Sequence, residues 1–201
     1  MQNLKRLVTF TLFILLLACG AKPLPELAYT DTILAFGDSL TAGVGAKETQ
    51  AYPAILQNLS NRTVINAGIS GETTTEGLQR FAQTINQYSP QLIILLEGGN
   101  DILRNHNQAK TKSNLEEMIL IAKNQAIPVV LIGVPEKSLF SDAAPLYAEL
   151  ADKYQLVYEG ELLAGLLKSP RLKSDPIHLN AQGYKKMAEE IHALLKRNGV
   201  L

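Results

Sequence analysis

Residues 32–40 read TILAFGDSL, a short apolar run that ends in a polar turn. Other short runs along the chain are also β-branched or aliphatic, as expected of strands buried on both faces: 63–67, 92–96, 129–134 and 156–158. Between these runs, apolar residues recur at helical spacing: Leu78, Phe81, Ala82 and Ile85; Leu115, Met118, Ile119 and Ala122; and Tyr184, Met187, Ala188, Ile191, Leu194 and Leu195. Strands that alternate with helices need right-handed crossovers, so we expect an α/β three-layer sandwich with a five-stranded parallel sheet.

Length and composition indicate one globular domain. The chain has 201 residues, of which 46% are hydrophobic, enough for a sizeable core. Lys plus Arg equals Asp plus Glu, at 19 each, so no basic field is present that would attract nucleic acid. We therefore expect no nucleic-acid partner, and a small, apolar or neutral ligand instead.

The first residues have the pattern of an export signal. Lys5 and Arg6 precede an uncharged apolar stretch, 7–17, which is short for a transmembrane helix. The stretch ends in LLAC, with Cys19 last, which resembles the lipobox of bacterial lipoproteins. The alternatives are an uncleaved anchor, or a conventional cut nearby that leaves Cys19 without a role.

This pattern divides the chain into a lipoprotein-type signal peptide (1–18), a tether with two prolines (19–31) and a domain (32–201). Cys19 is the only cysteine, so no intramolecular disulfide can form. We expect an exported protein of the bacterial cell envelope, facing the periplasm and held at a membrane by a lipid on Cys19.

Polar motifs follow three of the expected strands. Gly37-Asp38-Ser39 follows the first, Gly68 the second, and Gly98-Gly99-Asn100-Asp101 the third. Ligands of open α/β sheets bind outside the carboxyl ends of the strands, so these motifs should converge on one crevice.

Ser39 has a candidate base far downstream. By itself, a serine between a strand and a helix is usually an N-cap or turn residue. Of the three histidines, His106 lies in a polar loop and His192 on the charged side of the last helix, which leaves His178. Asp175 is spaced to share a turn with His178 and to hold its ring, so the three residues can form a nucleophilic triad. The segment also fits a loop that enters a helix capped by Asn180, and both descriptions can hold together.

Acyl transfer also needs hydrogen-bond donors for the developing oxyanion. The candidates are the N–H groups of Ser39 and Gly68 and the side-chain amide of Asn100. Taken separately, the glycine and Asn100 motifs are equally typical of tight turns. We assign Asp101 to holding its loop.

The motifs GDSL (37–40), NAGISG (66–71), GGND (98–101) and Asp175-x-x-His178 resemble, in order, the conserved blocks of the SGNH or GDSL hydrolase family. Within it, the chain is similar to the bacterial arylesterase, acyl-CoA thioesterase I and lysophospholipase L1 group. The resemblance implies a flavodoxin-like fold, Ser39 as nucleophile, Gly68 and Asn100 in the oxyanion hole, an Asp175–His178 pair, and no metal or cofactor. Glu97 is a departure, since leucine is common at its place.

Other chemistries lack their motifs. The sequence has no G-x-S-x-G, no H-E-x-x-H and no G-x-x-x-x-G-K-[ST], and too few Cys and His for a zinc cluster. We therefore expect a cofactor-independent serine esterase that cleaves acyl, aryl or lysophospholipid esters, or thioesters. The alternatives are a carbohydrate O-deacetylase of the same family and a lipoprotein that binds lipid or glycan without catalysis.

Overall fold

The strand TILAFG of the opening motif lies in the middle of a parallel sheet of five strands. The computed structural model describes residues 24–136 and 142–201, and Cys19 and the predicted signal peptide lie outside these ranges. The strands are β1 (Thr32–Gly37), β2 (Thr63–Gly68), β3 (Leu92–Leu96), β4 (Val129–Ile132) and β5 (Val157–Glu159). Their order across the sheet is β2-β1-β3-β4-β5, with every pairing parallel.

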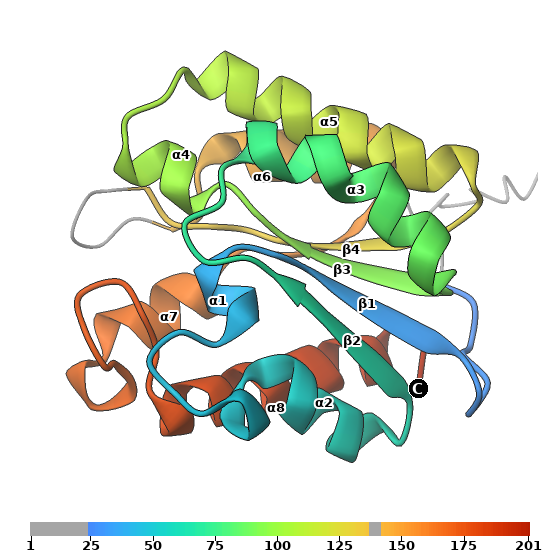
Figure 1. Cartoon of the computed structure of the whole chain (residues 1–201), viewed down its shortest axis with the longest axis horizontal. Coiled ribbons are helices and arrows are strands. Elements are labelled where there is room, and N and C mark those ends of the chain that lie inside the picture. Colours follow the sequence, from blue (N-terminus) through green and yellow to red (C-terminus); the bar gives the residue numbers. More distant parts are fainter. Residues whose placement is uncertain (1–23, 137–141) are drawn as a thin grey trace, which may run out of the picture.

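Helices cover both faces of the sheet (Figure 1). One layer contains α1 (Ser39–Ala42), α2 (Tyr52–Ser60), α7 (Leu162–Lys168) and α8 (Ala181–Arg197). The other contains α3 (Thr74–Tyr88), α4 (Gly99–Leu103), α5 (Gln108–Asn124) and α6 (Pro145–Tyr154). Two 3₁₀ turns, η1 (Glu48–Gln50) and η2 (Pro170–Leu172), lie in the connections. The predicted three-layer sandwich with a five-stranded parallel sheet is confirmed.

Some predicted details were wrong at the edges of the sheet. The run 129–134 leaves the sheet at Ile132, and the last strand starts and ends one residue later than 156–158. In β2 only Val64 is buried, because this strand has a neighbour on one side only. In α3, Ala82 is exposed although its spacing placed it on the apolar face, which Gly77, Phe81 and Ile85 occupy.

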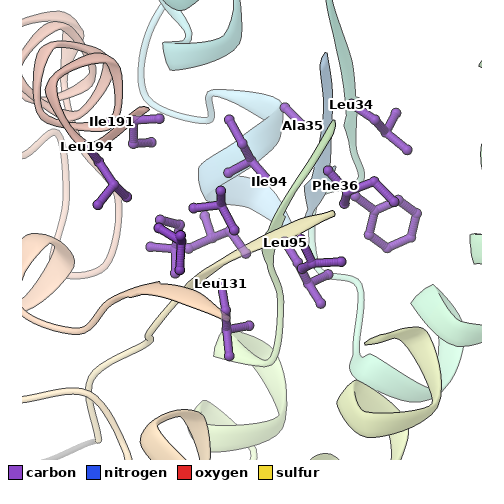
Figure 2. Packing of buried hydrophobic residues seen from close by; sticks show 14 of the residues in the cluster. Leu34, Ala35, Phe36, Ile94, Leu95, Leu131, Ile191 and Leu194 are labelled. Atoms are coloured by element: carbon purple, nitrogen blue, oxygen red, sulfur yellow. The ribbon is translucent and has the colours of Figure 1, made fainter. Parts of the chain in front are cut away.

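The core packs against both faces of the central strands. Phe36 of β1 meets Phe81 of α3 edge to face, with the ring centroids 4.8 Å apart. Figure 2 shows Ile94 on the opposite face, toward Ile191 and Leu194 of α8. Because every residue of β3 is buried, the middle of the sheet is a rigid base for the loops at its carboxyl edge.

The described end of the expected tether lies against the domain. Leu27 is only 3% exposed, and its N–H donates to the carbonyl of Val200 at 2.9 Å. The guanidinium of Arg62 donates to the carbonyl of Leu27, also at 2.9 Å. The domain therefore begins before residue 32, at least from Leu27, because an apolar side chain there completes the core.

The chain reverses its direction of travel across the sheet next to β1. From β1 it moves outward to β2, and from β2 it crosses over to β3 on the other side of β1. The loops that leave β1 and β3 therefore diverge and open a crevice between them, the usual ligand position in doubly wound sheets. Ser39 follows β1 and Asn100 follows β3, so both side chains lie at this opening.

Candidate active site

In the turn after β1, the hydroxyl of Ser39 is not used to cap the helix that follows. Asp38 is the N-cap of α1, and its Oδ1 accepts the N–H of Leu40 at 3.0 Å. Ser39 is therefore not needed as the cap, which was the alternative role for a serine at this place. Its Oγ lies 3.0 Å from Nε2 of His178.

Asp175 and His178 share the turn that precedes α8. Oδ2 of Asp175 lies 2.7 Å from Nδ1 of His178. Oδ1 of Asp175 accepts the backbone N–H groups of Ile177 at 2.9 Å and of His178 at 2.8 Å. Asn180 caps α8 by accepting two N–H groups of its first turn, so the segment also enters a helix as the sequence suggested. The aspartate thus orders the turn and the imidazole together.

The charge on Asp175 determines which tautomer of His178 faces the serine. Partial burial acts to raise the pKa of Asp175, but hydrogen bonds from the ring of His178 and from two backbone N–H groups outweigh it and lower the pKa. An ionised carboxylate can only accept, so Nδ1 carries the proton. Nε2 is then left with its lone pair directed at the hydroxyl of Ser39.

Asn100 is held with one amide hydrogen to spare. Its Nδ2 donates to the backbone carbonyl of Glu72 at 2.9 Å, and a primary amide has a second hydrogen to donate. Gly98, with φ at +108°, allows the sharp turn from β3 into α4 that brings Asn100 to the crevice. Ser39 is the first residue of α1, so its own N–H has no helical acceptor.

Gly68 lies against α1, with its N–H already engaged. A Cβ at this position would come within 2.1 Å of the backbone nitrogen of Ala42, so only glycine allows this approach. The N–H of Gly68 donates to Oδ1 of Asn66 at 3.0 Å. Asn66 is exposed, and in this structure it occupies a donor that the sequence had assigned to the oxyanion.

Asp101 fastens α4 to its neighbours. Its carboxylate accepts the N–H and the hydroxyl of Thr74, each at 2.8 Å, and the hydroxyl of Thr111 at 3.2 Å. Thr74 begins α3 and Thr111 lies in α5, so one buried carboxylate joins three helices. This agrees with the structural role that we expected for Asp101.

Buried acids lie beneath the site. Asp38 is 3% exposed and Glu97 is fully buried. Burial is the main cause that raises the pKa of Asp38 to about 6, against the lowering effect of hydrogen bonds from the N–H groups of Leu40 and Gly99 and of the nearby His178. Burial, followed by the charge of Asp38, raises the pKa of Glu97 well above its ordinary value.

An apolar pocket opens beside Ser39 and Asn100. Its volume is about 510 Å³, within the range of small-molecule sites. The apolar part of its wall comes from α4, from the segment after β4, from α7 and from the turn before His178, through Ile102, Leu103, Val134, Ala164, Leu167 and Ile177. The pocket can therefore take an apolar group whose reacting end reaches the serine.

The other histidines lie away from this arrangement. His106 is 3.7 Å from Asp101 and half exposed, and His192 lies in α8, where partial burial lowers its pKa.

Sequence reasoning missed the contact of Asn66 with Gly68, and it missed the ion pair between Arg80 and Glu72, whose backbone carbonyl accepts the amide of Asn100. Asn66 stands two residues before Gly68 in the same motif, so its capacity to bond a nearby N–H was visible. Arg80 carried no such signal, because it reaches Glu72 only through the packing of α3.

Within 24–136 and 142–201, no helix is long and apolar enough to span a bilayer. In the same ranges, no three His, Cys, Asp or Glu side chains are grouped so as to hold a metal ion.

Known proteins resemble this chain over most of its length. The model of the GDSL-like Lipase/Acylhydrolase family matches residues 35–186. The arylesterase of Vibrio mimicus is 31% identical over 195 residues, which cover 92% of this chain and 94% of that protein. Thioesterase 1/protease 1/lysophospholipase L1 of Escherichia coli K12 is 30% identical over 161 residues, 76% of this chain and 77% of that protein.

A solved structure agrees with these matches. The crystal structure of AlinE4, an SGNH-hydrolase family esterase, superposes with a TM-score of 0.67 at 30% sequence identity. The alignment covers 86% of this chain and 98% of that one.

Proposed function

Because the chain belongs to the GDSL-like lipase/acylhydrolase family, also called SGNH hydrolases, we propose that it cleaves its ester substrates through an acyl-enzyme on Ser39. The chain is an ester-hydrolysing enzyme, as are relatives whose names read arylesterase and thioesterase/lysophospholipase. The observation that carries the assignment of the residues is the continuous hydrogen-bonded series from Asp175 through His178 to Ser39, at 2.7 Å and 3.0 Å.

The first half of the reaction forms the acyl-enzyme. Nε2 of His178 takes the proton of Ser39 as Oγ bonds to the carbonyl carbon of the substrate. The carbonyl oxygen becomes an oxyanion, which accepts hydrogen bonds from the N–H of Ser39, the free amide hydrogen of Asn100 and the N–H of Gly68 once Asn66 has turned away. When the tetrahedral intermediate collapses, the bond to the leaving alcohol or thiol breaks and His178 gives that group its proton.

The second half releases the acid. His178 takes a proton from water, which attacks the acyl carbon, and a second oxyanion is held by the same donors. The bond to Oγ then breaks and Ser39 regains a proton from His178. Asp175 stays ionised throughout and keeps the ring in one orientation. These steps use side chains and backbone N–H groups of the chain, together with water.

The pocket supports a single acyl chain as the group that is bound. Its apolar wall begins beside Ser39, so an acyl chain can lie in it while the alcohol part points outward. Burial of one methylene contributes about 0.8 kcal/mol, so kcat/KM should rise by up to about fourfold per methylene until the pocket is full. Aryl esters and lysophospholipids both satisfy this description, whereas an acetyl group would leave the wall largely uncovered.

Hydrolysis of p-nitrophenyl esters of graded acyl length tests the nucleophile and the pocket together. We expect kcat/KM to rise from acetate toward medium chains and to fall by about 10³-fold or more in Ser39→Ala. Ser113→Ala, in an exposed part of α5, is the matched control and should keep full activity. Activity that survives in Ser39→Ala would refute the role of the serine, and a maximum at acetate would favour the deacetylase alternative.

A substitution in the pocket wall tests the binding of the acyl chain separately from the catalytic steps. Leu167 lies in α7 and lines the pocket, so the larger ring of Leu167→Trp should fill part of the pocket. The preferred acyl chain should then be shorter, with acetate hydrolysis little changed. Leu120→Trp, at an exposed position of α5, is the control for the added ring. An unchanged chain-length profile in Leu167→Trp would place the acyl group elsewhere.

We also propose that residues 1–18 are a signal peptide and that Cys19 carries the lipid that holds the enzyme at the envelope. The support is the charged start, the apolar stretch and the LLAC motif of the sequence. Labelling of growing cells with radioactive palmitate should mark the wild-type protein but not Cys19→Ala. Label that persists in Cys19→Ala would refute lipidation of this residue. Unlabelled wild-type protein released into the periplasm would support export but refute the lipid anchor.

A further inference from the structure

Glu97 is a buried acid that the proposed mechanism does not use. It follows β3 directly and is fully buried. Oε1 accepts the N–H of Gly98 at 3.0 Å, and Oε2 has no hydrogen-bond partner among the described residues. A carboxylate with one oxygen unpaired and no access to water is far more costly than a neutral carboxyl group. The surroundings therefore favour the protonated form.

The groups that face Glu97 add negative rather than positive charge. Acids approach it from the turn after β1, from the segment before α3 and from α4: Asp38, Glu72 and Asp101. From α6, the phenol of Tyr147 donates to the backbone carbonyl of Glu97 at 2.8 Å. Burial first, and the charge of Asp38 next, therefore raise the pKa of Glu97 well above its ordinary value.

The basic side chains around the site are engaged with other acids. Arg80 donates from Nε to Oε1 of Glu72 at 2.6 Å and bonds its second oxygen as well. His178 faces Asp38 and is held by Asp175. Neither side chain forms an ion pair with Glu97.

Glu97 contacts the backbone that carries the oxyanion donor. It holds the N–H of Gly98, two residues before Asn100. Asp38, in turn, approaches Gly99 so closely that a Cβ there would lie 2.7 Å from its Oδ2. Two buried carboxyl groups therefore support successive residues of the turn before Asn100, and Asp38 also holds the N–H next to Ser39.

We infer that Glu97 is a positioning residue that works in its protonated form: neutral, it holds the turn of Gly98 without placing a second charge beside Asp38 and the oxyanion. Loss of its proton at alkaline pH places two repelling carboxylates under this turn and adds a negative charge close to the developing oxyanion. Both effects lower kcat/KM at alkaline pH. This inference rests on the proposed function of Ser39 and Asn100.

Infrared spectroscopy tests the protonation without reference to activity. At pH 8, where Asp38 is ionised, the carbonyl band of a protonated carboxyl group is expected in the wild type. The band should be absent from Glu97→Gln and present in Glu117→Gln, the same change at an exposed position of α5. A wild-type spectrum without the band, or a band that survives in Glu97→Gln, would overturn the inference.

The pH dependence of kcat/KM tests the consequence. Glu97→Gln keeps the acceptor for Gly98 and cannot ionise, so at pH 7 it should remain within about threefold of the wild type. Between pH 7 and 10, the wild type should lose activity relative to Glu97→Gln by tenfold or more. Parallel alkaline limbs would overturn the role, because a merely structural side chain does not change the pH profile.

Glu97→Leu separates charge from positioning. It also lacks the alkaline loss, but it leaves the N–H of Gly98 without its acceptor, so its kcat should fall by about tenfold at pH 7. Equal kcat in Glu97→Leu and Glu97→Gln would refute the positioning part. If the wild type has no esterase activity, the proposed function fails, whereas the infrared result still decides whether Glu97 carries a proton.

Discussion

At the residue scale, Asn66 occupies the N–H of Gly68, which we propose as a donor to the oxyanion. Its side-chain oxygen accepts the N–H of Gly68 at 3.0 Å, and this bond must break before that N–H can reach an oxyanion. A neutral hydrogen bond contributes about 1 kcal/mol net, and Asn66 is exposed, so the cost of displacing it is small. In the resting site the three residues of the proposed triad are thus in hydrogen-bond contact, whereas one of the proposed oxyanion donors is occupied.

We therefore predict that Asn66→Ala increases kcat/KM by about two- to fivefold, because Gly68 no longer has to exchange partners. Steady-state hydrolysis of a p-nitrophenyl ester measures the effect. Asn100→Ala is the contrasting variant, since it removes a donor and should lower kcat by about 10²–10³-fold. A loss of activity in Asn66→Ala would mean that its amide orders the loop rather than blocking the donor.

Asp38 makes the stability of the fold depend on pH. Its pKa is about 6 in the folded protein against 3.8 for the free side chain, so the folded state binds the proton more tightly. Stability is then greatest below pH 4 with respect to this group and decreases as the pH rises through 6. The full difference corresponds to about 3 kcal/mol, because one pKa unit is worth about 1.4 kcal/mol.

Urea denaturation at a series of pH values between 4 and 7 measures this contribution as the difference between the wild type and Asp38→Asn. The wild-type free energy of unfolding should decrease more steeply with pH than that of Asp38→Asn, whatever constant offset the substitution adds. Parallel curves would show that Asp38 does not retain its proton in this range.

At the scale of elements, the site depends on how α3, α4 and α5 are joined. Asp101 accepts three hydrogen bonds from residues of α3 and α5, so the helix that carries Asn100 is fixed from two sides. A short helix such as α4 has little stability of its own and depends on such contacts.

Asp101→Asn should therefore lower both stability and rate. The NH₂ group of the new asparagine would face an N–H or hydroxyl of Thr74 or Thr111 that needs an acceptor. A buried group left without a partner in this way costs about 1–3 kcal/mol of the free energy of unfolding. We expect kcat to fall with KM nearly unchanged, because Asn100 shifts while the pocket remains. Asp152→Asn, exposed in α6, is the control, and equal stability of the two variants in urea would contradict the prediction.

At the scale of the whole molecule, the start of the domain is closed against its end. Leu27 is buried beneath the last residues through its bond to Val200, and Arg62 from the segment before β2 holds its carbonyl. The same guanidinium lies 4.2 Å from the ring centroid of Tyr29. This closure lies at the amino edge of the sheet, away from the crevice.

Leu27→Ala should therefore decrease the free energy of unfolding by about 2–4 kcal/mol, the usual cost of truncating a buried leucine. The activity of the folded fraction should not change. Leu59→Ala, at a position of α2 where the side chain is 37% exposed, should cost less than about 1 kcal/mol. Equal midpoints of the two variants in urea would show that the segment around Leu27 does not contribute to the core.

Most of the fold could be predicted because local pattern and global topology agree. The runs of β-branched and aliphatic residues mark the buried strands, and strands that alternate with helices allow few topologies. The predictions failed at β2 and at Ala82, where burial depends on which neighbours the chain acquires. No local pattern distinguishes an edge strand from a central one when both are apolar.

The sequence by itself determined the class of fold, the order of the motifs along it and the candidate residues Ser39, Asp175 and His178, because spacing and periodicity are properties of the chain. Only the tertiary structure decided which other residues contact the site and hold its groups in place. It placed Asn66 on the N–H of Gly68, and it buried Glu97 next to Asp38. The contact of Asn66 is local, whereas the approach of Glu97 to Asp38 joins residues far apart in the chain, and its energy comes from desolvation and proximity, which exist only after the chain has folded.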